Sequence, residues 1–494
     1  MTPIDMDHLT LDSFRDRHVA VLGLARSGIA LARFLHERGA TVTVYDGRTR
    51  EQLARELEQI ERTDSRLLLG PDIDPRAALE GQALIATSPS INSHYPTTEP
   101  RLRAALAEIE NAGVVPVVSE VDLFLRLCPA TTVGVTGTKG KTTTSSLIAA
   151  VLGAGPMPVV LGGNIGIPLV ERLPELTAAH RVVVELSELQ LPTLSRGTDV
   201  AVFTHVTSDH LDRHGTLEAY RAVKRRLAEL LPKDGRLVLN AEDPVSSQFE
   251  HATDAATIFY RRGEPLPGGI GVSDRWIVGR DVRLLGSGTV AMTGAEGRIM
   301  PVDEIPLLGE HNVSNVLAAV AVGLLFGVAP DGIRRAVATF VGVEHRLEPV
   351  VSVDGVLFVN DSQGTQPDAV IAALRSFEPP IVLICGGRSK NVPIDALARE
   401  VAQRAAAVIV IGETADEFAA AFSAAGARNI KHAGDLEAAV RTSYETARDL
   451  GGGTVLLSPA ATSFDMFVDY AARGTAFKDV VRMVAAERAT DGKR

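Results

Sequence analysis

The sequence predicts an α/β protein of three domains with mostly parallel sheets. Two observations support this fold class. Short runs rich in valine, isoleucine and leucine alternate with helix-like stretches along most of the chain, a pattern typical of strands joined by crossover helices. The length of 494 residues suits about three domains of ordinary size. We place these domains at residues 1–118, 119–343 and 344–494.

The first domain is predicted to begin with a βαβ unit. A buried strand is expected at residues 18–24, an amphipathic helix at 27–38 and a second strand at 41–45. A further strand at 83–86 leads into a turn, and ligands of open sheets bind at such carboxyl strand ends. This order of elements predicts a Rossmann-like first domain.

The turn of that βαβ unit is close to a dinucleotide-binding turn without matching it fully. It carries Gly23, Ala25 and Gly28, one alanine short of the fingerprint, and Asp46 follows at about the expected distance. Many α/β domains need glycine where a helix meets a strand. An NAD-dependent oxidoreductase is therefore one open interpretation, supported by this turn alone.

The strongest functional signal is the glycine- and threonine-rich segment at residues 134–144. It reads GVTGTKGKTTT, follows an apolar run and precedes a helix-like stretch. Backbone N–H groups of such a turn can surround phosphate oxygens, Lys141 can reach the outer phosphates, and Thr142 can hold Mg²⁺. The general P-loop would require glycine at Val135, so the spacing is a compact variant. We predict a nucleoside triphosphate site on a P-loop-type central sheet; a purely structural turn is the alternative.

Later strands are predicted in the central and C-terminal domains. Glycine, arginine and short alternating runs between residues 263 and 305 indicate an antiparallel excursion. The C-terminal domain repeats the alternation of strands and helices and is predicted to be Rossmann-like. Central strands are expected at 132–135, 159–161, 182–186, 200–204 and 237–240, with helices at 145–152, 217–231 and 313–326. C-terminal strands are expected at 356–360, 381–385, 407–411 and 455–458.

Polar residues follow two of the central strands. Glu185 lies where one strand ends, and Asp209 and His210 follow the next. In a doubly wound sheet these ends lie near the phosphate loop, so the carboxylate suits a Mg²⁺ ligand. A solvated acid and a structural histidine are the alternatives. Lys224 lies in the following predicted helix, where a lysine is normally a solvated charge, and the periodicity does not single it out.

Composition excludes several classes of protein. The net charge of -11 argues against a nucleic-acid surface. No uncharged run approaches the ~20 residues that a membrane-spanning helix needs, and the first residues lack the pattern of a signal peptide. Cys128 and Cys385 are far apart in apolar surroundings, so we expect buried free thiols. These features predict a cytoplasmic protein that neither binds nucleic acid nor inserts into membranes.

A set of motifs links the central and C-terminal domains to a known family. The motifs are the loop at 137–144, Glu185-Leu-Ser187, Asp209-His210-Leu-Asp212, Tyr220 to Lys224, Gly309 to Asn315, His345-Arg346-Leu-Glu348 and Asn360-Asp361-Ser362. In order and in residue identity they resemble the Mur ligases, which join an amino acid to a carboxylate using ATP. The segment SPAATSFDMF at residues 458–467 is similar to the C-terminal signature of the branch that adds D-glutamate.

The resemblance implies an activity and its cofactors. Such an enzyme adds D-glutamate to UDP-N-acetylmuramoyl-L-alanine through an acyl phosphate, in peptidoglycan precursor synthesis. It uses ATP and two Mg²⁺ ions, and we expect it to act as a cytoplasmic monomer. The resemblance also implies a carbamylated lysine at Lys224, which turns a cation into a ligand for the second Mg²⁺ beside His210.

The resemblance also assigns site residues. Lys141, His210 and Lys224 match catalytic positions. The metal ligands match Thr142, Glu185, His210 and carbamylated Lys224. The ATP-binding positions match Gly137, Thr138, Lys139, Gly140, Lys141, Thr142, Thr143, Asn312, Asn315, Arg346 and Asp361. The UDP-substrate positions match Arg26, Ser27, Asp46, Gly47, Arg48, Ser88, Pro89 and Asn164, and the glutamate positions match Thr365, Lys390, Ser463, Phe464 and Tyr470.

The chain departs from the family pattern at a few positions. Gln363 replaces a lysine that usually follows the Asp-Ser pair, which removes a charge but leaves hydrogen-bond donors. Lys139, Glu188 and Ser90 are also unusual for the family. These departures leave open a ligase that adds L-glutamate to the same nucleotide. A binding module driven by ATP is the remaining alternative, although it would have no need of Lys224.

Overall fold

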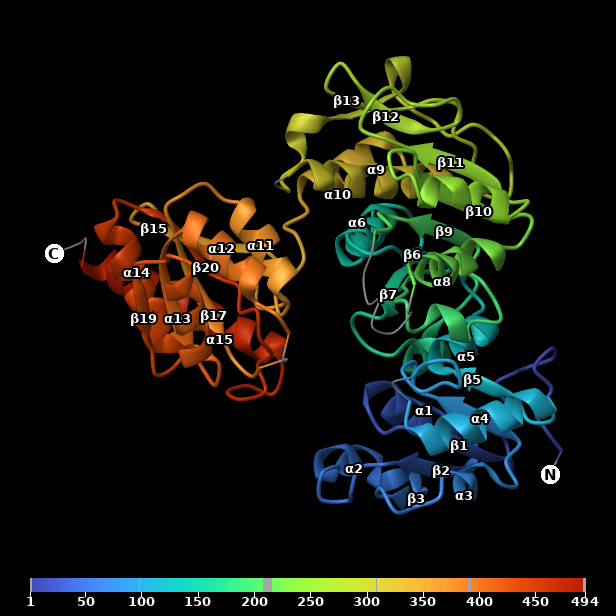
Figure 1. Ribbon diagram of the computed structural model, residues 1–494. Helices are drawn as coiled ribbons and strands as arrows, with labels where there is room; N and C mark the ends of the chain where they lie inside the picture. The colour runs from blue at the N-terminus through green and yellow to red at the C-terminus, as the bar shows by residue number, and fades with distance from the viewer. Residues whose placement is uncertain (1, 97, 208–215, 308, 390–391, 492–494) are drawn as a thin grey trace. The chain divides into compact units, whose positions relative to one another are not determined.

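The computed structural model describes residues 2–96, 98–207, 216–307, 309–389 and 392–491. The chain forms two compact units. The first comprises residues 1–306 with 310–340, and the second comprises residues 307–309 with 341–494. Each unit has α/β architecture, as predicted, and Figure 1 labels many of its elements.

The first sheet of the first unit is fully parallel, with strand order β3-β2-β1-β4-β5. This order of the strands is the Rossmann arrangement, which confirms the Rossmann-like fold expected for this part of the chain. The strands are β1 (His18–Leu22), β2 (Thr41–Asp46), β3 (Arg66–Leu69), β4 (Leu84–Thr87) and β5 (Val117–Ser119). The helices are α1 (Arg26–Glu37), α2 (Ala54–Ile60), α3 (Arg76–Leu79), α4 (Pro100–Ala112) and α5 (Glu120–Leu127).

Glycine at the β1–α1 turn has a packing role. Strand β1 ends at Leu22, two residues earlier than predicted, because Gly23 takes a positive φ of 84° and turns the chain. A Cβ atom on Gly28 would come within 1.7 Å of the carbonyl oxygen of Gly23. Both glycines are therefore needed for close contact between helix and strand, whether or not a nucleotide binds here.

The second sheet has nine strands in the order β14-β13-β12-β11-β10-β9-β6-β8-β7. In the part of the sheet that runs from β7 through β8, β6, β9, β10 and β11 to β12, neighbouring strands are parallel. Strand β13 pairs antiparallel with both β12 and β14, which confirms the predicted antiparallel excursion. The parallel strands are β6 (Thr131–Thr136), β7 (Val159–Gly163), β8 (Arg181–Glu185), β9 (Val200–Phe203), β10 (Arg236–Asn240), β11 (Ala256–Tyr260) and β12 (Ile270–Ser273). The excursion continues with β13 (Trp276–Gly279) and β14 (Arg298–Pro301).

Helix α9 (Glu310–Leu325) is the buried helix of the second sheet. It is apolar on nearly all sides and packs against α6 (Lys141–Gly153), as expected for a helix enclosed by protein. Helix α6 begins at Lys141, four residues before the predicted start, so its first turn lies directly at the phosphate loop. Two other helices of this part of the chain are α8 (Leu217–Glu229) and α10 (Pro330–Ala338).

The second unit contains a six-stranded sheet of order β15-β16-β20-β17-β18-β19. All neighbouring strands are parallel except β15 and β16. The strands are β15 (Glu348–Val353), β16 (Val356–Asn360), β17 (Ile381–Gly386), β18 (Ala405–Ile411), β19 (Ile430–His432) and β20 (Gly453–Leu457). The helices are α11 (Pro367–Arg375), α12 (Asp395–Arg404), α13 (Ala415–Ala424), α14 (Leu436–Asp449) and α15 (Tyr470–Asp491).

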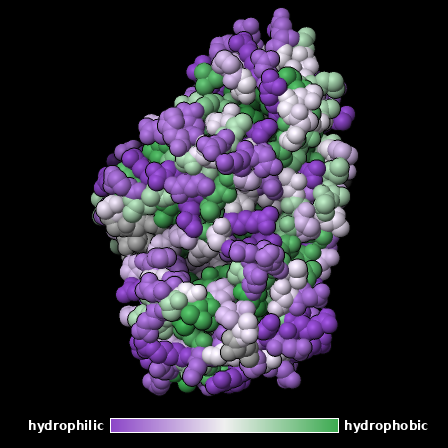
Figure 2. All heavy atoms as spheres, turned by 90° about the vertical axis from the view of Figure 1, so that its right-hand side faces the viewer, coloured by the Kyte–Doolittle hydropathy of each residue, from purple (hydrophilic) through white to green (hydrophobic). Residues whose placement is uncertain are grey.

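On the face drawn in Figure 2, hydrophilic side chains predominate and hydrophobic ones appear in small groups between them.

Among the helices that the structure describes, none is long and apolar enough to cross a membrane. Both cysteines are free; Cys385 is buried as predicted, whereas Cys128 is only partly buried.

A buried carboxyl group lies between α5 and the 3₁₀ helix η2 (Leu169–Glu175). Glu120 is 2% exposed and accepts a hydrogen bond from the backbone N–H of Val170 at 3.1 Å. Burial raises the pKa of Glu120 to about 7, although backbone hydrogen bonds from Val170 and Leu169 oppose the shift. The folded protein therefore keeps this proton at pH values where the unfolded chain has lost it.

The free energy of unfolding is expected to fall as the pH rises from about 4.5 to 7 because of Glu120. Over this interval the unfolded chain binds fewer protons than the folded protein, so the loss amounts to about 3 kcal/mol. Glu120→Gln cannot ionise, so thermal unfolding should show the variant gaining stability over wild type as the pH rises. A difference between the two proteins that is constant across this pH range would refute the assignment.

Candidate active site

The phosphate loop connects β6 to α6. Gly137 and Gly140 have φ values of 153° and 86°, and a Cβ atom on Gly137 would come within 2.0 Å of Thr204 Oγ1. Neither position can take a side chain without rearrangement. The ammonium group of Lys141 donates to the carbonyl oxygens of Gly137 and Thr138, at 3.1 and 3.0 Å. The loop is thus a tight turn at a helix N-terminus with a lysine folded over it, the arrangement that suits phosphate.

Helix α9 braces the same loop. Asn315 Oδ1 accepts a hydrogen bond from Thr144 Oγ1 at 3.1 Å, and Asn315 Nδ2 donates to Asn312 Oδ1 at 2.9 Å. A Cβ atom on Gly140 would lie 2.7 Å from Asn315 Oδ1. The structure therefore brings both predicted asparagines to the loop, although they are about 170 residues away in sequence.

Glu185 lies beside the loop on the neighbouring strand β8, in register with Val135 of β6. It is 1% exposed, and its Oε1 accepts a hydrogen bond from Asn164 Nδ2 at 2.8 Å. The other oxygen, Oε2, has no hydrogen-bond donor among the described residues. A buried carboxylate oxygen without a partner is costly, and a hard cation such as Mg²⁺ would satisfy it. Glu185 therefore fits the metal-binding role that the sequence assigns to it.

Lys224 is fully buried, which the sequence did not reveal. Its side chain has 0% exposure, and its Nζ donates to Thr136 Oγ1 at 3.3 Å at the end of β6. The Nζ atom lies 5.5 Å from the ring centroid of Tyr220, whose hydroxyl group bonds to Thr138 Oγ1 at 2.8 Å. Helix α8 thus turns this lysine inward, to the end of β6 where the phosphate loop begins.

Two predicted residues of this site, Asp209 and His210, lie outside the described residues. The segment before them borders the loop, because Thr138 N donates to the His205 carbonyl oxygen at 2.7 Å and Thr207 N donates to Thr138 Oγ1 at 3.0 Å. Within the described ranges, no group of three or more His, Cys, Asp or Glu side chains converges. The ligand set implied by the resemblance has one acidic side chain, Glu185, together with Thr142, Lys224 and His210. Because His210 lies outside the described residues, this set stays a prediction.

The predicted UDP-substrate residues gather at the carboxyl ends of β1, β2 and β4, with Asn164 as the exception. Asp46 is already paired there, accepting from Leu24 N at 2.8 Å and from the Arg48 guanidinium. Burial opposes ionisation of Asp46, but these hydrogen bonds outweigh it and lower its pKa. The other residues at these strand ends are Arg26, Ser27, Gly47, Ser88 and Pro89.

Arg26 links this part of the chain to the metal-binding candidate. Its guanidinium donates to the carbonyl oxygens of Gly166 and Asn164, at 2.9 and 3.4 Å. Asn164 in turn holds Glu185 through its side chain and donates its backbone N–H to the Glu185 carbonyl oxygen at 2.9 Å. Asn164 therefore lies beside the phosphate loop, with Arg26 fixing the turn that carries it.

In the second unit, Asp361 lies at the carboxyl end of β16. It accepts from Ser458 Oγ at 2.6 Å and from Leu347 N at 3.2 Å, and burial raises its pKa to about 6. Arg346, the neighbouring predicted ATP-binding residue, precedes Leu347 in the turn that contacts Asp361. Gln363, the departure from the family pattern, has a buried Oε1 atom without a hydrogen-bond partner among the described residues.

The predicted glutamate-binding residues differ in their surroundings. Ser463 is 2% exposed, whereas Phe464 and Tyr470 are 59% and 41% exposed. Thr365 is partly buried, and its backbone N–H donates to the Gln363 carbonyl oxygen at 2.8 Å. Lys390 lies outside the described residues, so the full set of this pocket stays a prediction.

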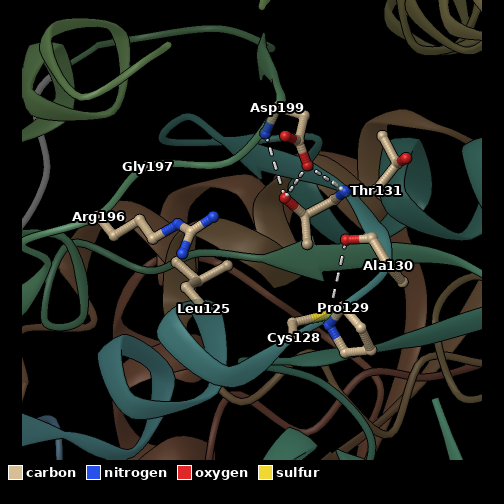
Figure 3. Close-up of a pocket in the computed structure, with 9 residues that line it drawn as sticks. Leu125, Cys128, Pro129, Ala130, Thr131, Arg196, Gly197 and Asp199 are labelled. Carbon is tan, nitrogen blue, oxygen red and sulfur yellow. Dashed lines mark hydrogen bonds between the residues drawn. The ribbon is translucent and has the colours of Figure 1, made fainter. Parts of the chain in front are cut away.

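A cavity of about 170 Å³ lies at the amino ends of two strands of the central sheet, β6 and β9. Thr131 at the start of β6 and Asp199 just before β9 line it together with Cys128 and Arg196, as Figure 3 shows. Thr132 also lines it. Burial raises the pKa of the Cys128 thiol to about 11, so the thiol is not a nucleophile at neutral pH. This cavity is not part of the phosphate-loop site, because that site lies at the carboxyl ends of the same strands.

Comparison with known proteins identifies the family to which the chain is similar. Family models match three segments of the chain: a Mur ligase MurD-like N-terminal domain at residues 17–112, a Mur ligase middle domain at 135–323, and a Mur ligase glutamate ligase domain at 345–461. Together the three matches cover most of the chain.

Curated relatives match over nearly the full length. A UDP-N-acetylmuramoylalanine--D-glutamate ligase from Pelotomaculum thermopropionicum is 37% identical over 95% of this chain and 98% of its own. The ligase of the same name from Symbiobacterium thermophilum is 38% identical over 94% of this chain and 98% of its own.

Solved structures share the fold at low sequence identity. UDP-N-acetylmuramate-alanine ligase MurC from Thermotoga maritima gives a TM-score of 0.54 at 17% identity, covering 95% of this chain and 100% of that one. A pseudomurein peptide ligase type C from Methanothermus fervidus gives a TM-score of 0.51 at 18% identity, covering 95% and 100%. On the strength of the family models and the curated relatives, the chain belongs to the Mur ligase family.

Proposed function

We propose that this chain is the ATP-dependent ligase that adds D-glutamate to UDP-N-acetylmuramoyl-L-alanine in peptidoglycan precursor synthesis. The observation that carries the proposal is the set of groups at one edge of the central sheet. The glycine loop with Lys141 follows β6, and the buried carboxylate of Glu185 lies at the end of the adjoining strand β8. The buried amine of Lys224, carried by α8, reaches the end of β6. The names of the relatives, matched over more than nine tenths of both chains, support the choice of substrates.

The chemistry requires activation of a carboxylate, because a carboxylate is a poor electrophile at neutral pH. One carboxylate oxygen of the alanyl group attacks the γ-phosphorus of ATP, and the bond to the bridging oxygen breaks to release ADP. The amine of glutamate then attacks the acyl carbon, and the phosphate leaves with the carboxylate oxygen. The amine must lose a proton, which His210 or a phosphate oxygen can accept.

The residues near the loop suit the first of these steps. Lys141 and the backbone N–H groups of the loop place positive charge where the transferring phosphoryl group carries negative charge. Thr142 and Glu185 would hold one Mg²⁺, and His210 with carbamylated Lys224 would hold another. Bound Mg²⁺ supplies further charge neutralisation of the phosphates.

Carbamylation of Lys224 is consistent with its surroundings. The neutral amine forms a bond to the carbon of CO₂ and loses a proton, which gives an anionic carbamate. Burial disfavours a charged ammonium group, and Lys224 is fully buried. The carbamate would place an anion beside Thr136, at the strand end where the phosphate loop begins.

The dinucleotide interpretation loses support from the first sheet. In a dinucleotide site the acidic residue after the second strand accepts a hydrogen bond from a ribose hydroxyl. Both carboxylate oxygens of Asp46 are already engaged by Arg48, and one also accepts from Leu24 N. An absorbance assay for bound or consumed nicotinamide is expected to be negative.

An oxygen-labelling experiment tests the proposed route. UDP-N-acetylmuramoyl-L-alanine labelled with ¹⁸O in its free carboxylate is incubated with ATP, Mg²⁺ and D-glutamate. We expect the released phosphate to carry one ¹⁸O atom, because the carboxylate oxygen leaves with it. Product formation with unlabelled phosphate would refute the acyl phosphate, and absence of product with these substrates would refute the proposed function.

A further inference from the structure

The turn that carries Arg346 has an unusual backbone. The residues on either side of Arg346, His345 and Leu347, have φ values of 64° and 44°. This left-handed region is unfavourable for residues with a Cβ atom, and such residues persist only where surrounding contacts hold them. The turn therefore needs a support, and the structure shows what supplies it.

Glu348 binds the turn from inside the second unit. Its Oε2 atom accepts a hydrogen bond from His345 N at 2.9 Å and another from Asn360 Nδ2 at 2.9 Å. Asn360, at the end of β16, has 0% exposure and also donates to His345 Nδ1 at 3.0 Å. One carboxylate oxygen and one amide thus fix the backbone and the ring of His345 together.

Lys478 of α15 holds the other oxygen of Glu348. Its Nζ atom donates to Glu348 Oε1 at 3.1 Å, and the residue is 8% exposed. Lys478 also pairs with Glu344, whose side chain is 65% exposed. A hydrogen-bonded ion pair with little exposure is worth more than a surface pair, so Lys478 fixes the Glu348 carboxylate in place.

The ring of His345 packs closely against α15. A Cβ atom on Gly474 would lie 2.2 Å from His345 Nδ1, so α15 has glycine where the ring lies. Burial lowers the pKa of His345, so the ring is neutral at pH 7 and its Nδ1 atom can accept the bond from Asn360.

The same turn is tied to the strand end that carries Asp361. Gln363 N donates to the His345 carbonyl oxygen at 2.9 Å, and Leu347 N donates to Asp361 Oδ1 at 3.2 Å. Movement of His345 would therefore disturb Arg346 and Asp361 together. Both residues match ATP-binding positions of the family.

We propose that Glu348, locked by Lys478, is a positioning residue that holds the strained His345–Leu347 turn so that Arg346 and Asp361 are presented to ATP. The inference rests on the proposed function, with the ATP-binding role of Arg346 and Asp361 that the family resemblance implies. It adds two residues, Glu348 and Lys478, that act on ATP affinity through Arg346 without contacting the nucleotide.

Glu348→Gln tests the inference, because it keeps the shape of the side chain and removes the charge that Lys478 holds. We expect the Kd of Mg²⁺-ATP, measured by isothermal titration calorimetry, to rise about tenfold to a hundredfold. In steady-state assays the KM for ATP should rise in the same way, while the KM values for D-glutamate and the nucleotide substrate stay within about twofold. Lys478→Met should give a smaller effect of the same kind. Equal increases in all three KM values would overturn the inference.

A double-mutant cycle separates positioning from a general structural effect. If Glu348 acts through Arg346, Glu348→Gln should change ATP affinity little in an Arg346→Ala background. Additive effects, or unchanged ATP affinity in Arg346→Ala alone, would overturn the inference. Arg482→Ala removes an exposed side chain of α15 that pairs with Asp479, and it serves as the control, with an expected change below about twofold. Calorimetry measures ATP binding without the ligation reaction. Failure of this inference would therefore appear as an unchanged Kd of Mg²⁺-ATP in Glu348→Gln, whereas failure of the proposed function would appear as absence of ligated product from the wild-type protein.

Discussion

Replacement of Lys224 by alanine is expected to abolish ligation, with kcat falling on the order of 10³-fold. The proposed carbamate is the only group that the lysine supplies to the second metal, so its loss should spare ATP affinity while stopping the reaction. A short carboxylate such as acetate, added in excess, should restore part of the activity because it replaces the missing anion. Steady-state phosphate release with and without acetate measures both effects.

The control for this variant is Arg225→Ala, one residue further along α8. Arg225 is exposed and pairs with Glu229 at 2.7 Å, so its loss should leave activity nearly unchanged. The fold of both variants is compared by thermal unfolding. Full activity of Lys224→Ala, or its inactivity without any rescue at any carboxylate concentration, would contradict the carbamate.

Glu185→Gln is expected to reduce ligation to a similar degree and to remove its normal dependence on Mg²⁺. The amide can still accept the hydrogen bond from Asn164, but its other end cannot serve as an anionic metal ligand. One oxygen of this buried carboxylate has no hydrogen-bond partner in the part of the chain that the structure describes, so its replacement also removes a desolvation cost. The variant should therefore be inactive yet at least as stable as wild type in the absence of ligands.

A Mg²⁺ titration of the reaction rate, together with thermal unfolding in EDTA, checks this prediction. Glu175→Gln is a suitable control, since its side chain is 59% exposed at the end of η2. A Glu185→Gln enzyme with the wild-type Mg²⁺ dependence would exclude Glu185 as a metal ligand. An unstable variant would show that the carboxylate has a structural role instead.

Much of the fold was predictable because it depends on local patterns. Apolar β-branched runs marked each strand that was predicted, and the glycine loop at 137–140 fixed the junction of β6 and α6. The predicted start of α6 was late because Thr142 and Thr143 are weak helix formers in isolation. In the protein the helix begins directly after Gly140.

The surroundings of the site residues were not predictable in the same way. Lys224 looks like a surface lysine in sequence, and its burial depends on Thr136, 88 residues away, and on the packing of Tyr220. Oε2 of Glu185, which has no hydrogen-bond donor within the described ranges, likewise depends on the turn that positions Asn164. Such contacts join distant segments and leave no periodic signal along the chain. The partial exposure of Cys128 was missed for the same reason, since Cys128 lines a cavity formed by several elements.

The central claim is the identity of the reaction, and phosphate release tests it most directly. Purified protein is given ATP, Mg²⁺ and UDP-N-acetylmuramoyl-L-alanine, with D-glutamate in one sample and L-glutamate in the other. We predict release, with formation of the ligated nucleotide, in the D-glutamate sample alone, which would also show that Gln363 is a tolerated replacement for the family lysine. Release with L-glutamate alone, or with neither amino acid, would contradict the proposed function.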